Sequence, residues 1–229
     1  QAKVYGWLLC QERDMPEINL AVVYFNVITQ HETAFHLTAT ADELRKFFEL
    51  QCSLYIRWAE YEREHRSQRD EALVRLRFPH AEFRSGQRQL ANQVYRAARD
   101  GHCLMAQATT GIGKTLGTLF PQLKAFPEQQ LDRLFFLTAK TPGRRLALDA
   151  LATLRSQDEA MPLRVLEHVA RDKACEHPDK ACHGDSCPLA KGFYDRLPAA
   201  RQAALEGQWL SHESVRATAL AHQICPYYL

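Results

Sequence analysis

A glycine-bearing loop followed by Lys and Thr is the stretch with the clearest chemistry. Residues 103–108 form a short apolar run that leads into this loop. The loop then passes through Gly113 to Lys114 and Thr115, where a helical pattern begins. In such a loop, backbone N–H groups and the helix N-terminus bind phosphates, the lysine reaches the β- and γ-phosphates, and the hydroxyl ligates Mg²⁺. Ala108 takes the place of the usual first glycine, which we interpret as a variant of the same nucleotide site.

Two further features bear on nucleotide chemistry. Gln87 lies upstream of the loop, and its amide offers a donor and an acceptor that match N7 and the 6-amino group of adenine. The alternative is an exposed glutamine at a helix start. The acidic pair that a phosphate-loop ATPase needs is missing, because Asp158-Glu159-Ala160 has no apolar strand before it. We therefore expect the chain to hold a nucleotide without hydrolysing it, and to end before the Walker B strand.

Lys140 and Thr141 follow a second apolar run at residues 134–138. In parallel α/β sheets, ligands bind beyond the carboxyl ends of the strands. Threonine and lysine there suit the phosphate oxygens of a nucleic-acid backbone. The alternative is an ordinary strand-to-helix loop in which Thr141 only begins a helix. We predict DNA contact at this loop, with Arg144 and Arg145 as supporting residues.

Four cysteines in the last third of the chain are candidate metal ligands, with the pattern Cys175-x6-Cys182-x4-Cys187-x37-Cys225. Structural zinc sites usually use two tight cysteine pairs, which this pattern lacks. Four thiolates from an irregular segment also fit a [4Fe–4S] cluster. Histidines in the same segment could replace a cysteine in a zinc site, and these are His177 and His183. The spacing leaves both the iron–sulfur and the zinc interpretation open.

The elements that must carry these residues alternate between helices and strands. Helical patterns and apolar runs follow one another in the order 87–100, 103–108, 114–126, 134–138 and 142–154. We expect Gly101 to be the C-cap of the first helix, residues 127–132 to form a loop and residues 163–169 to form a third strand. Apolar runs between helices are typical of a parallel sheet that is covered on both faces. We predict an α/β fold over 78–170. Over 171–229 the hydrophobic periodicity fails at first, so we predict a mainly helical domain that a metal must stabilise.

Residues 1–77 precede this fold and have the pattern of a separate α+β segment. A helix and two alternating strands that form a hairpin are expected at 1–13, 18–29 and 34–38. Thr40 and Glu43 then fit a capping box, in which each side chain bonds to the backbone of the other. A long amphipathic helix should follow.

The composition excludes several classes of protein. The chain has 229 residues, of which 46% are hydrophobic and 24% charged. Its net charge is only +2, so any DNA-binding surface must be a local patch. No apolar run approaches the roughly 20 residues of a membrane span. An intracellular nucleotide-binding protein does not need a disulfide scaffold, so the clustered cysteines indicate metal ligation in a cytoplasmic protein.

Taken together, these motifs resemble those of one family. Phe-Arg-Ser-Gly-Gln, Ala-Thr-Thr-Gly-Ile-Gly-Lys-Thr, Leu-Thr-Ala-Lys-Thr and a four-cysteine insertion closing on Cys-Pro-Tyr-Tyr occur in this order. The order is similar to that in the N-terminal part of XPD/DinG-type superfamily 2 DNA helicases. The resemblance covers about residues 78–229, and the cysteine spacing resembles a bacterial DinG-type branch.

The resemblance implies an ATP-dependent DNA helicase of 5′→3′ polarity, a monomeric motor acting in DNA repair or replication on single-stranded or forked DNA. It implies part of a RecA-like motor domain that uses ATP and Mg²⁺, with an inserted domain holding a [4Fe–4S] cluster. The implied nucleotide-binding residues are Arg84, Gln87, Thr110, Gly111, Ile112, Gly113, Lys114 and Thr115. Lys114 and Thr115 would also be catalytic. The implied DNA contacts and cluster ligands are Lys140, Thr141, Cys175, Cys182, Cys187 and Cys225. Walker B, the second motor domain and the arginine finger are absent from this chain.

A second, shorter resemblance concerns the first residues. Gln1 and Tyr5 match the Gln-x3-Tyr helix that follows the catalytic core of RecB-like PD-(D/E)XK nucleases. Some bacterial helicases of this family carry such a domain upstream in the same chain. A plain amphipathic helix is the alternative. The chain contains no Asp…Glu-x-Lys set, so we expect no nuclease activity from it alone.

Two other functions remain open at this point. The chain could be a zinc-stapled nucleic-acid-binding module with a nucleotide loop that does not hydrolyse. It could also be a nuclease-associated scaffold whose motor is inactive. Metal analysis distinguishes the zinc-stapled module from a helicase. DNA-stimulated ATP hydrolysis distinguishes the inactive scaffold from a helicase.

Overall fold

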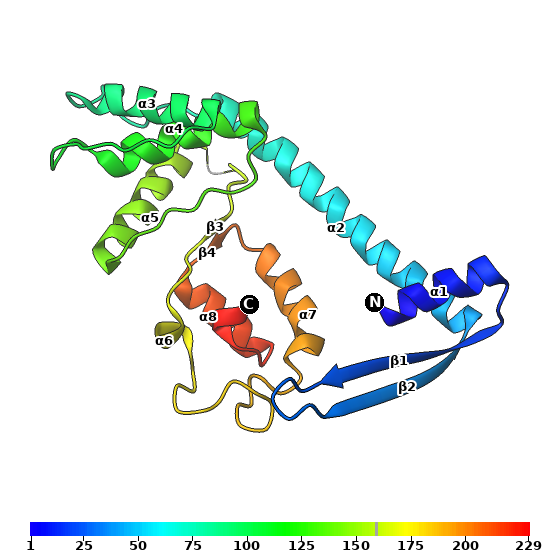
Figure 1. Cartoon of the computed structure of the whole chain (residues 1–229). Helices are drawn as coiled ribbons and strands as arrows, with labels where there is room; N and C mark the ends of the chain where they lie inside the picture. Colours follow the sequence, from blue (N-terminus) through cyan, green and yellow to red (C-terminus); the bar gives the residue numbers. More distant parts are fainter. Residues whose placement is uncertain (159) are drawn as a thin grey trace. The chain divides into compact units, whose positions relative to one another are not determined.

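The computed structural model describes residues 1–158 and 160–229 as a mixed α/β chain that is mostly helical (Figure 1). Glu159, part of the acidic tripeptide considered above, lies outside the described residues. The chain divides into two compact units, Gln1–Ser67 and Gln68–Leu229. Residues 68–77, which we predicted to belong to the N-terminal segment, therefore pack with the second unit. The predicted cysteine domain also lies within the second unit.

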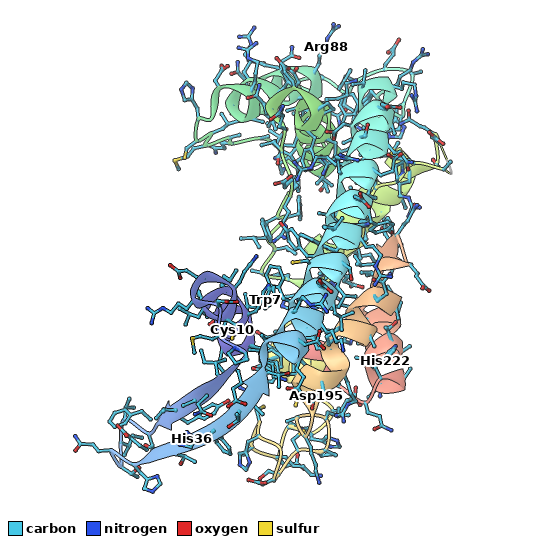
Figure 2. The ribbon with its side chains drawn as sticks, turned by 90° about the vertical axis from the view of Figure 1, so that its right-hand side faces the viewer. Trp7, Cys10, His36, Arg88, Asp195 and His222 are labelled. Carbon is cyan, nitrogen blue, oxygen red and sulfur yellow. The ribbon has the colours of Figure 1, made fainter. Side chains whose placement is uncertain are left out.

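The first unit consists of a helix, a hairpin and the first part of a long helix. α1 (Ala2–Arg13) leads into β1 (Glu17–Phe25), which pairs antiparallel with β2 (Glu32–Thr40). The predicted helix and hairpin are thus confirmed. Cys10 and Leu44 are buried at the centre of this unit, and Figure 2 shows Cys10 on α1. Trp7 of α1 and Ile18 and Leu20 of the hairpin pack against this small core.

The long helix α2 (Ala41–Arg75) begins at the predicted capping box. Thr40 N and Oγ1 donate to Glu43 Oε2 at 2.9 and 3.0 Å, and Glu43 N donates to Thr40 Oγ1 at 3.3 Å. These reciprocal bonds satisfy N–H groups that a helix start leaves without intrahelical partners. The capping box is confirmed.

Three helices carry the motifs of the predicted motor. α3 (Gln87–Asp100), α4 (Lys114–Gln129) and α5 (Thr141–Arg155) follow in order, with α4 packed against both of the others (Figure 1). α3 ends at Gly101, which has a φ of 66° and acts as the predicted C-cap. α4 continues through Pro127, where we predicted a loop. Ala125 and Phe126, directly before this proline, are buried, so the helix packs against the core up to its last turn.

The main core of the second unit lies between α4, α5 and the end of α2. Its buried side chains are Ala72, Leu73, Leu76, Leu116, Leu123, Phe126, Leu154, Met161, Leu163 and Val165. Lys124 of α4 donates to the Leu73 and Val74 carbonyls at 3.2 and 2.6 Å. Since the last carbonyls of a helix have no intrahelical partners, this lysine fastens the end of α2 to α4.

The two apolar runs of the predicted parallel sheet are not paired as strands within the described residues. Residues 103–108 and 134–138 form irregular connections that lead into α4 and α5. Most of their side chains are exposed, with Met105 at 100% and Leu137 at 88%, while Leu134 is partly buried against the main core. Cys103, at the start of the first run, is exposed as well. Two-sided apolar strands are stable only between neighbours that cover both faces, and the described residues do not place such neighbours here.

The last third of the chain is mainly helical, as predicted. Its elements are α6 (Arg171–Ala174), α7 (Phe193–Leu205), α8 (His212–Ala221) and a final 3-10 turn η1 (Pro226–Tyr228). The short strand β3 (Val165–Leu166) lies within the predicted third strand and pairs in parallel with β4 (Trp209–Leu210). In residues 1–158 and 160–229, none of the helices has both the length and the apolar character to cross a lipid bilayer.

Candidate functional site

The phosphate loop folds as a turn at the N-terminus of α4. Gly111 and Gly113 have φ angles of 89° and 83°, in the left-handed region that glycine adopts without strain. Gly113 is the residue directly before α4, so the first N–H groups of this helix lie at the loop. A turn of this kind at a helix start is suited to bind an anion.

The two residues predicted to be catalytic lie at the start of α4. Lys114 Nζ donates to the carbonyls of Ala108 and Thr109 at 3.1 and 2.9 Å, so its ammonium folds back over the loop. An ammonium has three donors and no acceptor, so phosphate oxygens can replace these carbonyls as its partners. Thr115 is the next residue and is half-buried in the first turn of α4.

Arg84 and Gln87, which we predicted to bind nucleotide, both lie against the loop. Arg84 Nη1 donates to the Gly111 carbonyl at 2.7 Å, and Gln87 Nε2 donates to the Gly113 carbonyl at 3.0 Å. Gln87 Oε1 accepts from Arg84 N at 3.1 Å, and the side chain is only 3% exposed. In this arrangement both ends of the amide bond to backbone, so Gln87 positions the loop. Its contact with adenine stays a prediction.

Close packing between the loop, α3 and α4 explains two glycines near Gln87. A Cβ at Gly117 would lie 3.3 Å from Gln87 Cγ, and a Cβ at Gly86 would lie 3.0 Å from Ile112 Cδ1. The loop therefore contacts the start of α3 through Ile112, while Thr110 stays exposed. The loop therefore packs against α3 on the side of Ile112 and is exposed on the side of Thr110.

We expect Gly113→Ala to destabilise the protein more than the same change at another left-handed glycine. A Cβ at Gly113 would lie 2.3 Å from Gln87 Nε2, so the bond from Gln87 must break in addition to the strain at a φ of 83°. We expect a loss of about 2–4 kcal/mol in the free energy of unfolding. Gly101→Ala is the matched control, because its φ is 66° and no atom lies within 4 Å of the added Cβ.

Denaturant unfolding of the two variants measures this difference. Gly101→Ala should cost only the backbone strain, about 1–2 kcal/mol. Equal losses in the two variants would contradict the contact between Gln87 and the loop.

The predicted DNA loop also lies at a helix N-terminus. Lys140 is the N-cap of α5, and both Lys140 and Thr141 are exposed. Thr138 Oγ1 donates to the Lys140 carbonyl at 3.1 Å, and a Cβ at Gly143 would lie 2.3 Å from this hydroxyl. The loop thus has a defined turn. It offers a cation and helix N–H groups, which are the groups that bind backbone phosphates.

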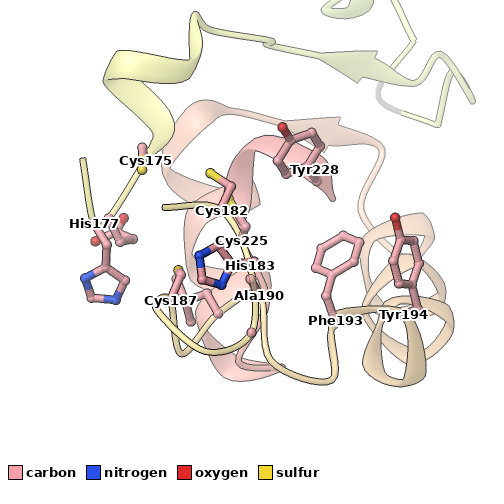
Figure 3. A pocket seen from close by; sticks show the side chains of 13 residues that line it. Cys175, His177, Cys182, His183, Cys187, Ala190, Phe193, Tyr194, Cys225 and Tyr228 are labelled. Carbon is pink, nitrogen blue, oxygen red and sulfur yellow. The ribbon is translucent and has the colours of Figure 1, made fainter. Parts of the chain in front are cut away.

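The four candidate metal ligands line one cavity of about 420 Å³ in the second unit (Figure 3). Its ionisable lining residues are Cys175, Glu176, His177, Cys182, His183, Cys187, Tyr194, Cys225 and Tyr228. All four cysteines are free thiols, with Cys187 buried and Cys182 exposed. The structure therefore brings together every cysteine that the sequence singled out as a ligand.

The cysteine side chains surround the cavity without converging on one point. Over residues 1–158 and 160–229, no group of three or more His, Cys, Asp or Glu side chains is placed to hold a metal ion. A structural zinc site needs four ligands, with sulfur at about 2.3 Å from the ion. Zinc binding would therefore require the cysteine loops to move closer together.

Donors approach two of the sulfur atoms. Arg171 Nη2 lies 3.1 Å from Cys182 Sγ, and the N–H groups of Tyr227 and Tyr228 donate to Cys225. Burial raises the pKa of the Cys225 thiol, the neighbouring cysteines raise it further, and the two N–H donors lower it. A metal ion would have to displace this proton, since the thiolate is the metal-binding form.

An ion pair fixes the segment after the first cysteine to α8. Arg216 bonds through two nitrogens to the two carboxylate oxygens of Glu176, and its Nη2 lies 2.8 Å from Oε2. This hydrogen bonding by Arg216 holds the pKa of Glu176 below its usual range. Bidentate pairs of this kind fix the relative orientation of both groups. Cys175 and α8 are thereby held together.

The candidate nuclease-tail residues lie at the start of α1. Gln1 is the N-cap, and its carbonyl accepts from Val4 N and Tyr5 N at 2.9 and 3.1 Å. Both Gln1 and Tyr5 are exposed. These bonds are those of any helix start, so the resemblance to a nuclease tail stays a prediction.

Sequence reasoning missed the charged residues that hold the cysteine cavity. Arg171, Glu176 and Arg216 lie in segments where charged residues are frequent, so no local pattern distinguishes them. Their partners lie elsewhere in the second unit, and only the folded chain brings them together.

Comparisons of the chain with models of protein families, with curated proteins and with solved structures found no match. The assignment of function therefore depends on the motifs and on the geometry described above. The strongest part of this geometry is that the predicted phosphate loop and the four-cysteine cavity lie in one compact unit.

Proposed function

We propose that this chain is part of an ATP-dependent DNA helicase that contains a [4Fe–4S] cluster. The observation that carries the proposal is the cavity lined by four cysteines, in the same unit as a phosphate loop held by Arg84 and Gln87. The cysteine cavity and the phosphate loop each occur alone in proteins of other functions. Their combination, in the order that the helicase motifs take, supports this function over the alternatives.

In this proposal the phosphate loop binds ATP with Mg²⁺. Phosphate oxygens replace the Ala108 and Thr109 carbonyls as acceptors from Lys114, and the Thr115 hydroxyl ligates Mg²⁺. Hydrolysis also requires an acidic residue that holds Mg²⁺ and orients water. We found no such motif in this sequence, so the activity assigned to this chain is nucleotide binding.

The placement of four cysteines around one cavity supports a cluster over a single zinc ion. In a [4Fe–4S] cluster each cysteine binds a different iron, so the thiolates surround a volume, as they do here. Donors to Cys182 and Cys225 are also typical of such sites, since hydrogen bonds to sulfur tune the cluster. A bound cluster would hold together a segment whose own buried core is small.

In the proposed motor the two exposed apolar runs would be strands of a parallel sheet. A phosphate-loop motor buries the strands before its two ligand loops within a parallel sheet. Residues 103–108 and 134–138 have the required apolar character, but neither is paired in the described part of the chain. The helicase proposal therefore requires further strands beside these two runs.

The proposal is tested by metal analysis and nucleotide binding on anaerobically purified protein. We expect iron and sulfide at about four each per chain, broad visible absorbance, and Mg²⁺-dependent binding of a fluorescent ATP analogue. One zinc per chain without visible absorbance would overturn the cluster assignment. Absence of nucleotide binding would overturn the motor assignment.

A zinc-stapled nucleic-acid-binding module is the second candidate. The observation that favours it is the presence of His177 and His183 in the lining of the same cavity. In that case His183→Ala should lower zinc content, whereas a four-cysteine cluster should keep its iron in this variant. The same metal analysis therefore decides between the two.

A further inference from the structure

Glu167 joins two parts of the second unit that carry different candidate sites. Its Oε1 lies 2.8 Å from Arg144 Nε, and its Oε2 accepts from His212 N at 2.8 Å. Arg144 is in the first turn of α5, directly after the predicted DNA loop, and His212 is the first residue of α8. One carboxylate thus links the DNA loop to the helix that leads to Cys225.

Burial strengthens the ion pair between Glu167 and Arg144. The Glu167 side chain is only 9% exposed, so solvent screens its ion pair with Arg144 little. Its backbone is fixed as well, because Glu167 N donates to the Leu210 carbonyl at 2.8 Å next to the β3–β4 pair. Moving either helix alone would break a charge-assisted bond of a largely buried carboxylate, which is costly.

α8 continues the connection to the cysteine cavity. Arg216 on this helix pairs with Glu176, which directly follows Cys175. At the other end of the helix, Ile224 N donates to a carbonyl of the last turn at 2.9 Å and fixes the residue before Cys225. A displacement of the start of α8 should therefore move both Cys175 and Cys225, which are far apart in the sequence.

We propose that Glu167 is a positioning residue that transmits DNA binding at the Lys140 loop to α8 and the cysteine cavity. This inference rests on the proposed function, because it takes DNA as the ligand of that loop. A phosphate group at the N-terminus of α5 displaces the first turn of this helix. Arg144 then moves Glu167, and Glu167 moves the start of α8 through His212.

Hydrogen exchange of the whole chain, with and without a single-stranded oligonucleotide, tests this transmission. In the unmodified chain we expect DNA to slow exchange in residues 138–146 and also in residues 212–221. In Glu167→Gln the amide oxygen keeps the bond from His212 N, but the ion pair with Arg144 is lost. Protection of 138–146 should then remain, while the response of 212–221 falls to less than about half.

Matched variants separate transmission from a general loss of structure. Glu206→Gln makes the same change at an exposed residue of the same unit and should keep both responses. Arg144→Gln leaves the Glu167–His212 bond intact and should lose the α8 response, whereas Arg144→Lys keeps the cation and should retain most of it. The exchange of α8 without DNA should be alike in Arg144→Gln and the unmodified chain.

The outcomes distinguish this inference from the function on which it rests. DNA binding that protects 138–146 but not 212–221 in the unmodified chain would overturn the transmission and leave the proposed function intact. A full α8 response in Glu167→Gln and Arg144→Gln would do the same. No DNA binding at all, measured by fluorescence anisotropy, would overturn the proposed function and this inference with it.

Discussion

Lys114→Ala should lower the affinity of this chain for ATP by about 100-fold. The variant loses the ammonium that now bonds to the Ala108 and Thr109 carbonyls and that we expect to bind phosphate. Loss of charge-assisted bonds to phosphate is worth about 3 kcal/mol, which corresponds to this factor. Titration with a fluorescent ATP analogue in the presence of Mg²⁺ measures it. In a helicase that contains this chain, hydrolysis and unwinding should be abolished.

Lys124→Ala is the matched control for this experiment. Lys124 lies on the same helix and also donates to two backbone carbonyls, but these belong to the end of α2. We expect this variant to lower the free energy of unfolding and to leave the affinity for ATP unchanged. Unchanged affinity in Lys114→Ala would contradict the assignment of the loop as a nucleotide site.

Cys225→Ser should remove most of the bound iron and destabilise the last third of the chain. The buried core of this segment is small, with Ala200, Ala219 and Ile224 at its centre, so the proposed cluster would hold it together. Loss of a structural metal site costs more than about 4 kcal/mol, which lowers the melting temperature by about 10 °C in a chain of this size. Iron analysis and thermal unfolding under anaerobic conditions measure the two effects.

Cys103→Ser provides the control, because this exposed cysteine lies in the same unit but outside the cavity. It should keep its iron and its melting temperature. Removal of the metal from the unmodified chain with a chelator should reproduce the loss of stability of Cys225→Ser. Full iron content in Cys225→Ser would show that this residue is not a ligand.

Local signals predicted most of the elements correctly. The Thr40–Glu43 capping box, the hairpin and the C-cap at Gly101 depend on residues that are close in sequence. The interactions that form them are therefore visible in the sequence pattern itself. The predicted parallel sheet was not confirmed, because an apolar strand needs partners from other parts of a fold, and residues 103–108 pair with no strand in the described chain.

The candidate site residues also include some that the sequence pattern identifies and some whose role only the folded chain shows. The motif around Lys114 and the four cysteines stand out by residue type and spacing, since phosphate and metal binding require particular groups. The role of Gln87 as a support of the loop was not visible, because it depends on a bond to Gly113 that forms only when α3 and α4 pack together.

The sequence by itself determined which residues have the chemistry to bind phosphate, DNA and metal, and where most helices begin. Only the tertiary structure decided that the four cysteines line one cavity and that Arg84 and Gln87 hold the phosphate loop. It also decided that Glu167 joins α5 to α8. These contacts link residues far apart in the chain, and their distances depend on helix packing, which no local pattern records.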